Sequence, residues 1–216
     1  MRFPKRRNEW LLGRLTTKDL LKNCSAEYAA IRSQDIQVTN EESGRPSLEL
    51  LNHISPKIQL SISHRDSIAF CAISFDAHLN IGVDLELVEE RFQSFVDDFF
   101  TPSEIDFVKN TNGTLHQEIV TIIWSAKEAI LKASGSGLRV DTRQVEICRI
   151  EGTAENEATA QEWHAIKAVY PSSRKDPWNL WWKPFEEYVL TLAVDNEDRT
   201  NPAEDEIVLQ EIRTTG

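Results

Sequence analysis

The sequence predicts an α+β fold built from two similar halves, because a helical stretch followed by short strands occurs twice along its 216 residues. The helical stretches repeat apolar residues with a period near 3.6, and the strand stretches alternate apolar and polar residues. A chain of this length can bury a sizeable core in one domain or in two modest halves. We place the boundary near Asn80, which gives an N-terminal unit 1–80, a C-terminal unit 81–195 and an acidic tail 196–216.

The first half is expected to open with a helix over residues 8–31. The apolar positions that define its period are Trp10, Leu11, Leu15, Leu20, Leu21 and Tyr28. Residues 40–46 are polar and contain glycine and proline, which predicts a loop. Residues 58–63 and 67–75 then predict two strands, and His64, Arg65 and Asp66 fall in the turn between them.

The second half begins with a strand over residues 81–86, followed by a helix over 92–100 and another that has Pro102 early in it. A helix that contains Glu128 comes next. A glycine-rich turn leads from it to three further strands, over 145–150, 163–170 and 188–194. The tryptophans at 178, 181 and 182 could form an aromatic cofactor site, but packing in the core or between subdomains is the safer interpretation.

Two segments of the second half carry the chemistry. In the strand 81–86, alternation puts Asp84 and Glu86 on one face, opposite the apolar residues. In the helix that follows, Glu128 and Lys132 stand four residues apart and share a face. Three carboxylates would form an oxygen-only ligand set suited to Mg²⁺, and the lysine would neutralise substrate phosphates. Separately, each motif also fits a solvated strand face or a surface ion pair.

At this point the chain resembles the phosphopantetheinyl transferases, of the type that activates surfactin synthetase. The resemblance covers residues 8–150 and rests on six ordered motifs. They are Gly44-Arg45-Pro46, Ser63-His64-Arg65, Gly82-Val83-Asp84-Leu85-Glu86, Phe99-Phe100-Thr101-Pro102-Ser103-Glu104, the segment from Trp124 to Lys132, and Gly135-Ser136-Gly137-Leu138.

The resemblance implies an enzyme that transfers the 4'-phosphopantetheine arm of coenzyme A to a serine of an apo acyl or peptidyl carrier protein, releasing adenosine 3',5'-bisphosphate. It implies Mg²⁺, or Mn²⁺, held by Asp84, Glu86 and Glu128. It also implies two α+β subdomains in a pseudo-twofold arrangement with the site between them. The length of the chain and its two similar halves favour a monomer over the trimer of the shorter holo-acyl-carrier-protein synthases.

The resemblance also implies individual roles. Glu128, directly or through a water on the metal, would be the base for the serine hydroxyl. Lys132 and His64 would complete the catalytic set by holding the phosphates, and Glu104 would lie in the outer shell of the metal. The expected coenzyme A contacts are Arg45, Pro46, Ser63, His64 and Lys132.

The chain departs from the family pattern in two places. Arg65 stands where the family usually has serine, so it either adds a phosphate contact or faces water. In relatives a longer segment with basic residues precedes the first helix, so we expect the chain to be truncated at its start. The basic residues crowded there could supply the missing charge or form a solvated helix face: Arg2, Lys5, Arg6, Arg7, Arg14, Lys18 and Lys22.

Composition narrows the class of protein. A formal net charge of −11 argues against general nucleic-acid binding. No apolar run approaches the length of a membrane span and no signal peptide is recognised, so we expect a cytoplasmic protein that does not bind membranes. Cys24, Cys71 and Cys148 form no disulfide framework and are expected to be buried. The alternative function is a degenerate module that holds coenzyme A or a carrier protein without turnover.

Overall fold

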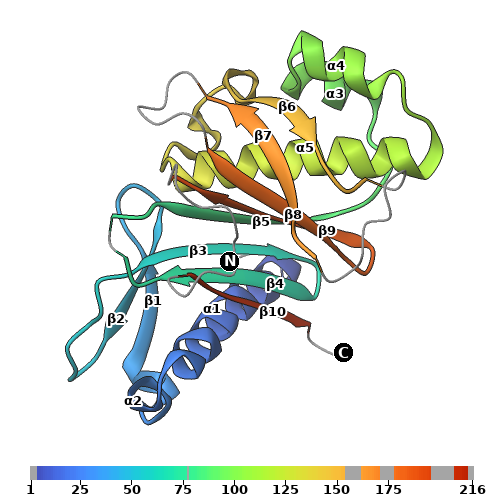
Figure 1. The fold of residues 1–216 in the computed structure, drawn as a ribbon. Helices are drawn as coiled ribbons and strands as arrows, with labels where there is room; N and C mark the ends of the chain where they lie inside the picture. Colours follow the sequence, from blue (N-terminus) through green and yellow to red (C-terminus); the bar gives the residue numbers. More distant parts are fainter. Residues whose placement is uncertain (1–3, 77, 154–161, 171–177, 196–206, 214–216) are drawn as a thin grey trace.

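The computed structural model describes residues 4–76, 78–153, 162–170, 178–195 and 207–213, and it confirms the α+β class. All strand pairs within its three sheets are antiparallel. Two of the sheets carry a long helix each, and they lie one above the other in Figure 1.

The α-helices are α1 (Pro4–Cys24), α2 (Ala26–Ala29), α3 (Gln93–Phe99), α4 (Pro102–Val108) and α5 (Gly113–Ala133), and the 3₁₀ turns are η1 (Ser33–Asp35), η2 (Gly137–Arg139) and η3 (Thr142–Gln144). The strands are β1 (Ile36–Asn40), β2 (Pro46–Leu50), β3 (Gln59–Arg65), β4 (Ile68–Ser74), β5 (Ile81–Leu87), β6 (Glu146–Ile150), β7 (His164–Val169), β8 (Asn179–Phe185), β9 (Tyr188–Val194) and β10 (Ile207–Arg213).

The first half is a three-stranded sheet, β10-β4-β3, with α1 packed against it and the hairpin β1-β2 beside it. Its core includes Leu20 and Leu21 of α1, which are almost fully buried against Ile36 and Ile73. The predicted helix 8–31 is interrupted at Ser25, whose side chain caps α2 by accepting from the backbone N–H of Tyr28. The predicted loop 40–46 joins the two strands of the hairpin, which were not predicted.

One sequence-based expectation is corrected here. The segment 196–216 was expected to be an acidic tail, but residues Ile207–Arg213 form β10, which pairs with β4 along seven residues. The pairing is favourable because β10 covers an edge of the fully buried strand β4 and places Ile207 in the core. Residues 196–206 and 214–216 lie outside the described residues.

The second half is a five-stranded sheet, β5-β9-β8-β7-β6, with α5 lying across it and α3 and α4 beyond the helix (Figure 1). Gly82 allows β5 to approach α5, because a Cβ atom there would lie 2.0 Å from the carbonyl oxygen of Ala129. The three tryptophans of residues 178–182 are 4%, 5% and 0% exposed, which confirms their packing role. They belong to or adjoin β8, a strand that the sequence did not predict.

The two halves meet at β3 and β5, which are edge strands of different sheets. β3 and β5 do not pair through their backbones, and serine side chains of β3 bond the backbone of β5 instead. Ser61 Oγ accepts from the backbone N–H of Val83 at 2.9 Å, and Ser63 Oγ accepts from that of Leu85 at 3.2 Å. Unpaired donors of an edge strand are thereby satisfied, and the residues on this seam are held in register.

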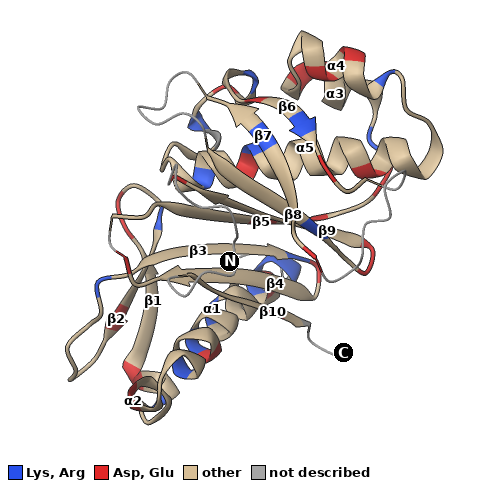
Figure 2. Cartoon of the chain, viewed as in Figure 1, with Lys and Arg blue, Asp and Glu red and all other residues tan. Residues whose placement is uncertain are grey.

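Within the described residues, no helix is both long and apolar enough to span a bilayer. The cysteines are free, as expected, but only Cys71 is buried; Cys24 is partly exposed and Cys148 is exposed. Basic side chains recur along α1 in Figure 2, whereas acidic side chains recur on α3 and α4.

Candidate active site

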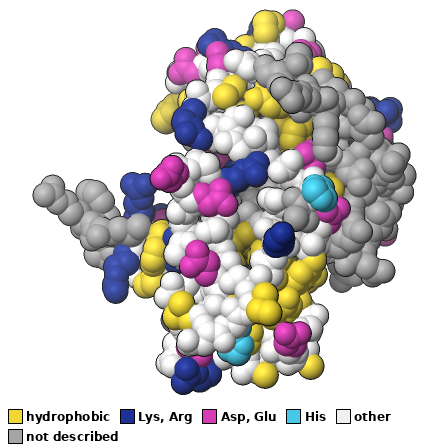
Figure 3. Space-filling model, turned by 90° about the vertical axis from the view of Figure 1, so that its left-hand side faces the viewer, with side chains coloured by type: hydrophobic (Ala, Val, Ile, Leu, Met, Phe, Trp, Pro, Cys, Tyr) yellow, Lys and Arg dark blue, Asp and Glu magenta, His cyan; other side chains and the backbone are white. Residues whose placement is uncertain are grey.

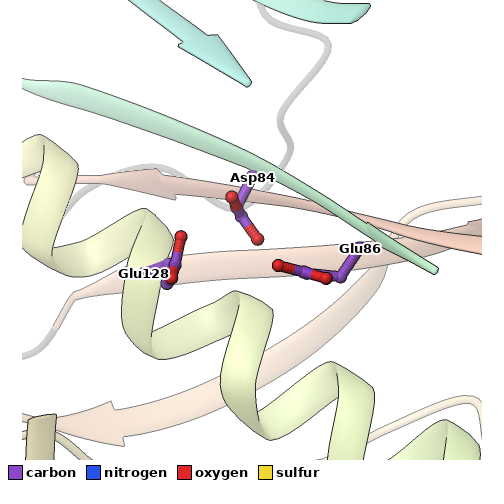
Figure 4. Close-up of side chains that lie close together, drawn as sticks. All are labelled: Asp84, Glu86 and Glu128. Atoms are coloured by element: carbon purple, nitrogen blue, oxygen red, sulfur yellow. The ribbon is translucent and has the colours of Figure 1, made fainter. Parts of the chain in front are cut away.

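The three acids predicted as metal ligands lie together beside the seam between the halves. Asp84 and Glu86 project from β5 toward α5, and Glu128 projects from α5 toward them (Figure 4). One carboxylate oxygen from each of the three lies within 4.8 Å of the others. Alternation along β5 and the approach of α5 at Gly82 bring the three together.

Asp84 is the most firmly held of the three and is 1% exposed. Its Oδ1 accepts from Ser63 Oγ at 2.9 Å and from Lys132 Nζ at 2.6 Å, and its Oδ2 accepts from Ser125 Oγ at 2.8 Å. Lys132 Nζ also donates to Ser63 Oγ and to the carbonyl of Val83, both at 3.1 Å. Residues of β3, β5 and α5 therefore converge on one carboxylate.

Burial and neighbouring negative charge raise the proton affinity of two of the acids, Glu86 and Glu128. Burial and the neighbouring Asp84 raise the pKa of Glu128 to about 8, although Lys132 opposes the shift. Burial and Asp84 also raise the pKa of Glu86. Burial disfavours the charged form of Lys132, but the attraction of the carboxylates outweighs it and raises the pKa of that lysine. A bound cation would relieve this surplus of negative charge, so the oxygen-only donor set fits Mg²⁺ or Mn²⁺.

Glu86 has partners that the other acids lack. Its Oε2 accepts from Arg65 Nη1 at 3.1 Å and from Arg91 Nη2 at 3.0 Å, and its Oε1 accepts from the indole N–H of Trp124 at 3.3 Å. Arg65 also donates to Glu89 Oε1 at 2.7 Å. The arginine that replaces the family's serine thus points into the acid cluster.

A cavity of about 710 Å³ opens next to Lys132, between the β1–β2 hairpin, β3 and the end of α5. Among the described residues that line it, five carry a positive charge and Glu41 alone a negative one; the five are Arg14, Arg45, Lys57, Lys132 and Arg139. Figure 3 shows the face at the left of Figure 1, where lysine and arginine side chains lie near the middle of the surface. An acidic protein therefore carries a locally basic cavity suited to phosphates.

Arg45 lines this cavity and is fixed at the end of α5. It donates to the carbonyl of Ala133 at 2.5 Å and to Asn80 Oδ1 at 3.3 Å. Gly135 makes room for it, since a Cβ at that glycine would lie 2.7 Å from Arg45 Nε. Pro46 lines the cavity beside it. Arg139 adds a second tie by donating to the carbonyl of Ser43 at 3.0 Å.

His64 lines the cavity on the β3 side. Its Nδ1 is buried and has no hydrogen-bond partner within the described residues. Burial lowers the pKa of His64, although Glu9 opposes the shift, so the ring is neutral at neutral pH. A buried polar atom without a partner beside a basic cavity is a ready contact for a ligand.

The first helix contributes a further cation. The guanidinium carbon of Arg14 lies 3.5 Å from the ring centroid of Trp10, and both residues line the cavity. Arg14 Nη2 also donates to Asn40 Oδ1 at 2.8 Å. Arg6 and Arg7, which could have added charge here or formed a solvated helix face, are exposed on α1 and are not among the described lining residues.

Two of the predicted residues have partners that the sequence did not indicate. Ser63, predicted to contact coenzyme A, is buried against Asp84 and is not among the described lining residues of the cavity. Glu104, predicted for the outer shell of the metal, forms a buried ion pair with Lys127 at 2.7 Å and accepts from the backbone N–H groups of Thr101 and Ile147. The expectation for Glu104 is corrected, because these partners occupy it as a helix cap and a structural tie.

Sequence reasoning missed several residues that hold the site. They are Ser61, Asn80, Arg91, Ser125 and Arg139. Ser61 could have been found from its alternation with Ser63 on one strand face. Asn80, Ser125 and Arg139 depend on contacts between distant segments, such as that of Asn80 with Asp195 at 2.5 Å. Arg91 contacts Glu86, five positions away, but no regular helix or strand pattern joins the two.

Comparison with known proteins adds independent findings. A family model described as the 4'-phosphopantetheinyl transferase superfamily matches residues 80–193. The 4'-phosphopantetheinyl transferase HetI of Nostoc sp. is 25% identical over 169 residues, which are 77% of this chain and 68% of that protein. A holo-[acyl-carrier-protein] synthase of Clostridium kluyveri is 38% identical over 77 residues, which are 32% of this chain and 56% of that protein.

A crystal structure described as a holo-(acyl-carrier-protein) synthase from Bacillus anthracis in complex with CoA (3',5'-ADP) superposes with a TM-score of 0.42 and 21% identity. The superposition covers 53% of this chain and 93% of that one. The chain thus spans between about half and two thirds of the length of the two curated relatives.

Proposed function

The chain belongs to the 4'-phosphopantetheinyl transferase superfamily, and from this premise we propose that it transfers the 4'-phosphopantetheine arm of coenzyme A to a serine of an apo carrier protein. The observation that carries the proposal is the contact between an acidic cluster and a basic cavity through Lys132. The cavity suits an anionic nucleotide, and the cluster suits the cation that such a ligand brings.

In the proposed reaction, the serine oxygen of an acyl or peptidyl carrier protein forms a bond to the phosphorus next to the pantetheine. The bond from that phosphorus to the bridging oxygen breaks, and adenosine 3',5'-bisphosphate leaves. The protein contributes mainly by positioning and by neutralising charge. Mg²⁺ or Mn²⁺, held by Asp84, Glu86 and Glu128, would supply charge neutralisation at the pyrophosphate.

The side chains have distinct proposed roles. Arg45 and Pro46 contact the nucleotide, while His64 and Lys132 hold the phosphates. Ser63 orients Asp84 and Lys132, which it contacts at 2.9 and 3.1 Å. Glu128, directly or through a water on the metal, would accept the proton of the incoming serine, a role supported by its position in the acid cluster beside Asp84 and Glu86.

We also propose that the protein acts as a cytoplasmic monomer whose two halves are related by a pseudo-twofold axis. The seam at β3 and β5, with one long helix packed on the sheet of each half, supports this arrangement.

The test is mass spectrometry of an apo carrier protein incubated with this protein, coenzyme A and Mg²⁺. We expect the mass of one phosphopantetheine to be added, and we expect loss of the product in excess chelator and in Asp84→Ala, Glu86→Ala and Glu128→Ala. Binding of coenzyme A without any mass change would instead support the non-catalytic binding module. Full transfer by the triple alanine variant would overturn the metal site.

A further inference from the structure

Resting on the proposed function, we propose that Arg65 and Arg91 lower the affinity of the site for its divalent cation by cancelling part of the charge of Glu86. Neither arginine belongs to the acid cluster or lines the cavity among the described residues. Both act through Glu86 and are therefore positioning residues.

The strand geometry explains how Arg65 reaches the cluster. Ser61, Ser63 and Arg65 follow one another at every second position of β3 and therefore share the face that meets β5. The two serines contact the backbone of β5, and Arg65, next in the row, reaches the side chain of Glu86 at 3.1 Å. A shorter side chain at this position would leave that carboxylate with one cation fewer.

Arg91 is the second arginine that contacts Glu86. Its Nη2 lies 3.0 Å from Glu86 Oε2 and 3.4 Å from Glu89 Oε1, and the same two carboxylates bind Arg65. The side chains of Arg91 and Glu86 are 18% and 12% exposed, so solvent screens the interaction incompletely. Arg65, Glu86, Arg91 and Glu89 thus form a ring of ion pairs in which cations and anions alternate. Arg65 belongs to β3 and Glu86 to β5, and the other two lie in residues 88–92.

This network makes the three acids unequal as partners for a cation. Glu86 faces two guanidinium groups, Asp84 faces one lysine, and Glu128 lies next to both acids. The number of uncompensated charges on the ligands is a main determinant of divalent-cation affinity. A guanidinium 3.1 Å from a ligand carboxylate repels a cation on the same carboxylate, so its removal strengthens binding.

Titration of the protein with Mn²⁺, followed by the electron paramagnetic resonance of the free ion and without coenzyme A, tests the inference directly. We expect Arg65→Gln and Arg91→Gln to tighten Mn²⁺ binding by about tenfold each. Arg65→Lys, which keeps the charge, should tighten Mn²⁺ binding less than Arg65→Gln does.

Lys5→Gln is the matched control. Lys5 binds Asp66, the neighbour of Arg65, at 2.6 Å, and its side chain is 72% exposed, so this variant removes a charge near the same turn without touching Glu86. Its Mn²⁺ affinity should equal that of the wild type. If Arg65→Gln does not fold, as judged by thermal melting, Arg91→Gln and Arg65→Lys still decide the question.

Unchanged or weaker Mn²⁺ binding in both glutamine variants overturns the inference, as does an equal gain in Lys5→Gln or a wild type that binds no Mn²⁺. The outcome is independent of catalysis, because neither coenzyme A nor carrier protein is present. If the two glutamine variants bind Mn²⁺ more tightly as expected but the wild type modifies no carrier protein, the proposed function is overturned and the inference on the arginines stands.

Discussion

Lys127 and Lys132 lie on the same helix and form ion pairs of nearly equal length, 2.7 Å to Glu104 and 2.6 Å to Asp84. Five positions along an α-helix correspond to a rotation of about 140° between them, so the two side chains leave α5 in different directions. Lys127 enters the packing between α4, α5 and β6, whereas Lys132 enters the seam between the halves.

The surroundings of the two pairs differ in charge balance and in access. Lys127 and Glu104 are both completely buried, and the backbone carbonyls of Thr142 and Val145 take further bonds from the lysine. Lys132 is 31% exposed, lines the cavity and faces three acids within one cluster. A closed and balanced pair supports the fold, while an open and unbalanced one is available to a ligand.

The largest expected effect is on stability and concerns Lys127. Lys127→Met should lower the free energy of unfolding by about 3–5 kcal/mol, because it leaves Glu104 as a buried charge without its cation. Urea denaturation measures the loss. The double variant Lys127→Met with Glu104→Gln should recover most of it, and an unaltered unfolding curve for the single variant would contradict the structural role.

The next effect is on catalysis and concerns Lys132. Lys132→Ala should slow transfer by about 100-fold, since a fixed charge donor contributes about 3 kcal/mol to the transition state. Its unfolding free energy should stay closer to that of the wild type than the value for Lys127→Met. Lys132→Arg should restore the rate only in part, because its planar group places the charge differently. Wild-type turnover in Lys132→Ala would remove this lysine from the site.

The unbalanced charge near Lys132 also predicts a pH dependence of stability in the metal-free protein. The pKa of Glu128 is about 8 in the fold against an ordinary value of 4.5, so the folded state holds the proton more tightly. The free energy of unfolding should therefore fall as the pH rises from about 4.5 to about 8, by at most about 1.4 kcal/mol per pH unit for this group.

Urea denaturation in the presence of a chelator, repeated across that window, checks this dependence. Glu128→Gln should make the free energy of unfolding less dependent on pH. In the wild type, replacing the chelator with Mg²⁺ should have the same effect. Equal slopes in the wild type and in Glu128→Gln would show that other groups cause the dependence.

The smallest expected effect is on coenzyme A binding and concerns His64, whose Nδ1 is buried. His64→Ala should weaken coenzyme A binding by about fivefold, which corresponds to one hydrogen bond of about 1 kcal/mol. Calorimetric titration with coenzyme A measures it, and affinity for the carrier protein should change less. Arg143→Ala serves as the control, since Arg143 is paired with Asp141 and is not among the described lining residues. The same affinity in His64→Ala and the control would return His64 to a structural role.

Local patterns in the sequence predicted most of the second half and the acid cluster. Alternation placed Asp84 and Glu86 on one face, and helical spacing placed Glu128 beside Lys132. The strand expected over 188–194 coincides with β9. These predictions succeeded because each depends on neighbours a few residues away.

Features that depend on distant partners could not be predicted in this way. β10 pairs with β4, which lies more than a hundred positions earlier in the sequence, and the pattern of its seven residues does not indicate which strand it will pair with. Arg65 could have faced solvent or a phosphate; only the position of β5 beside β3 directs it to Glu86. Glu104 looked like a site residue because the Phe-Phe motif contains it, but the buried side of α4 turns it toward Lys127.

The pairing of β10 with β4 also bears on how the protein is made. A ribosome releases α1, β3 and β4 early, but the strand that completes their sheet follows every other described element. Nascent chains usually fold from the N-terminus, one unit at a time. Here the sheet of the first unit is completed only by β10, and before β10 pairs, one edge of β4 is open to pairing with other chains. We therefore expect this edge of β4 to be protected from pairing with other chains only after β10 has docked on it.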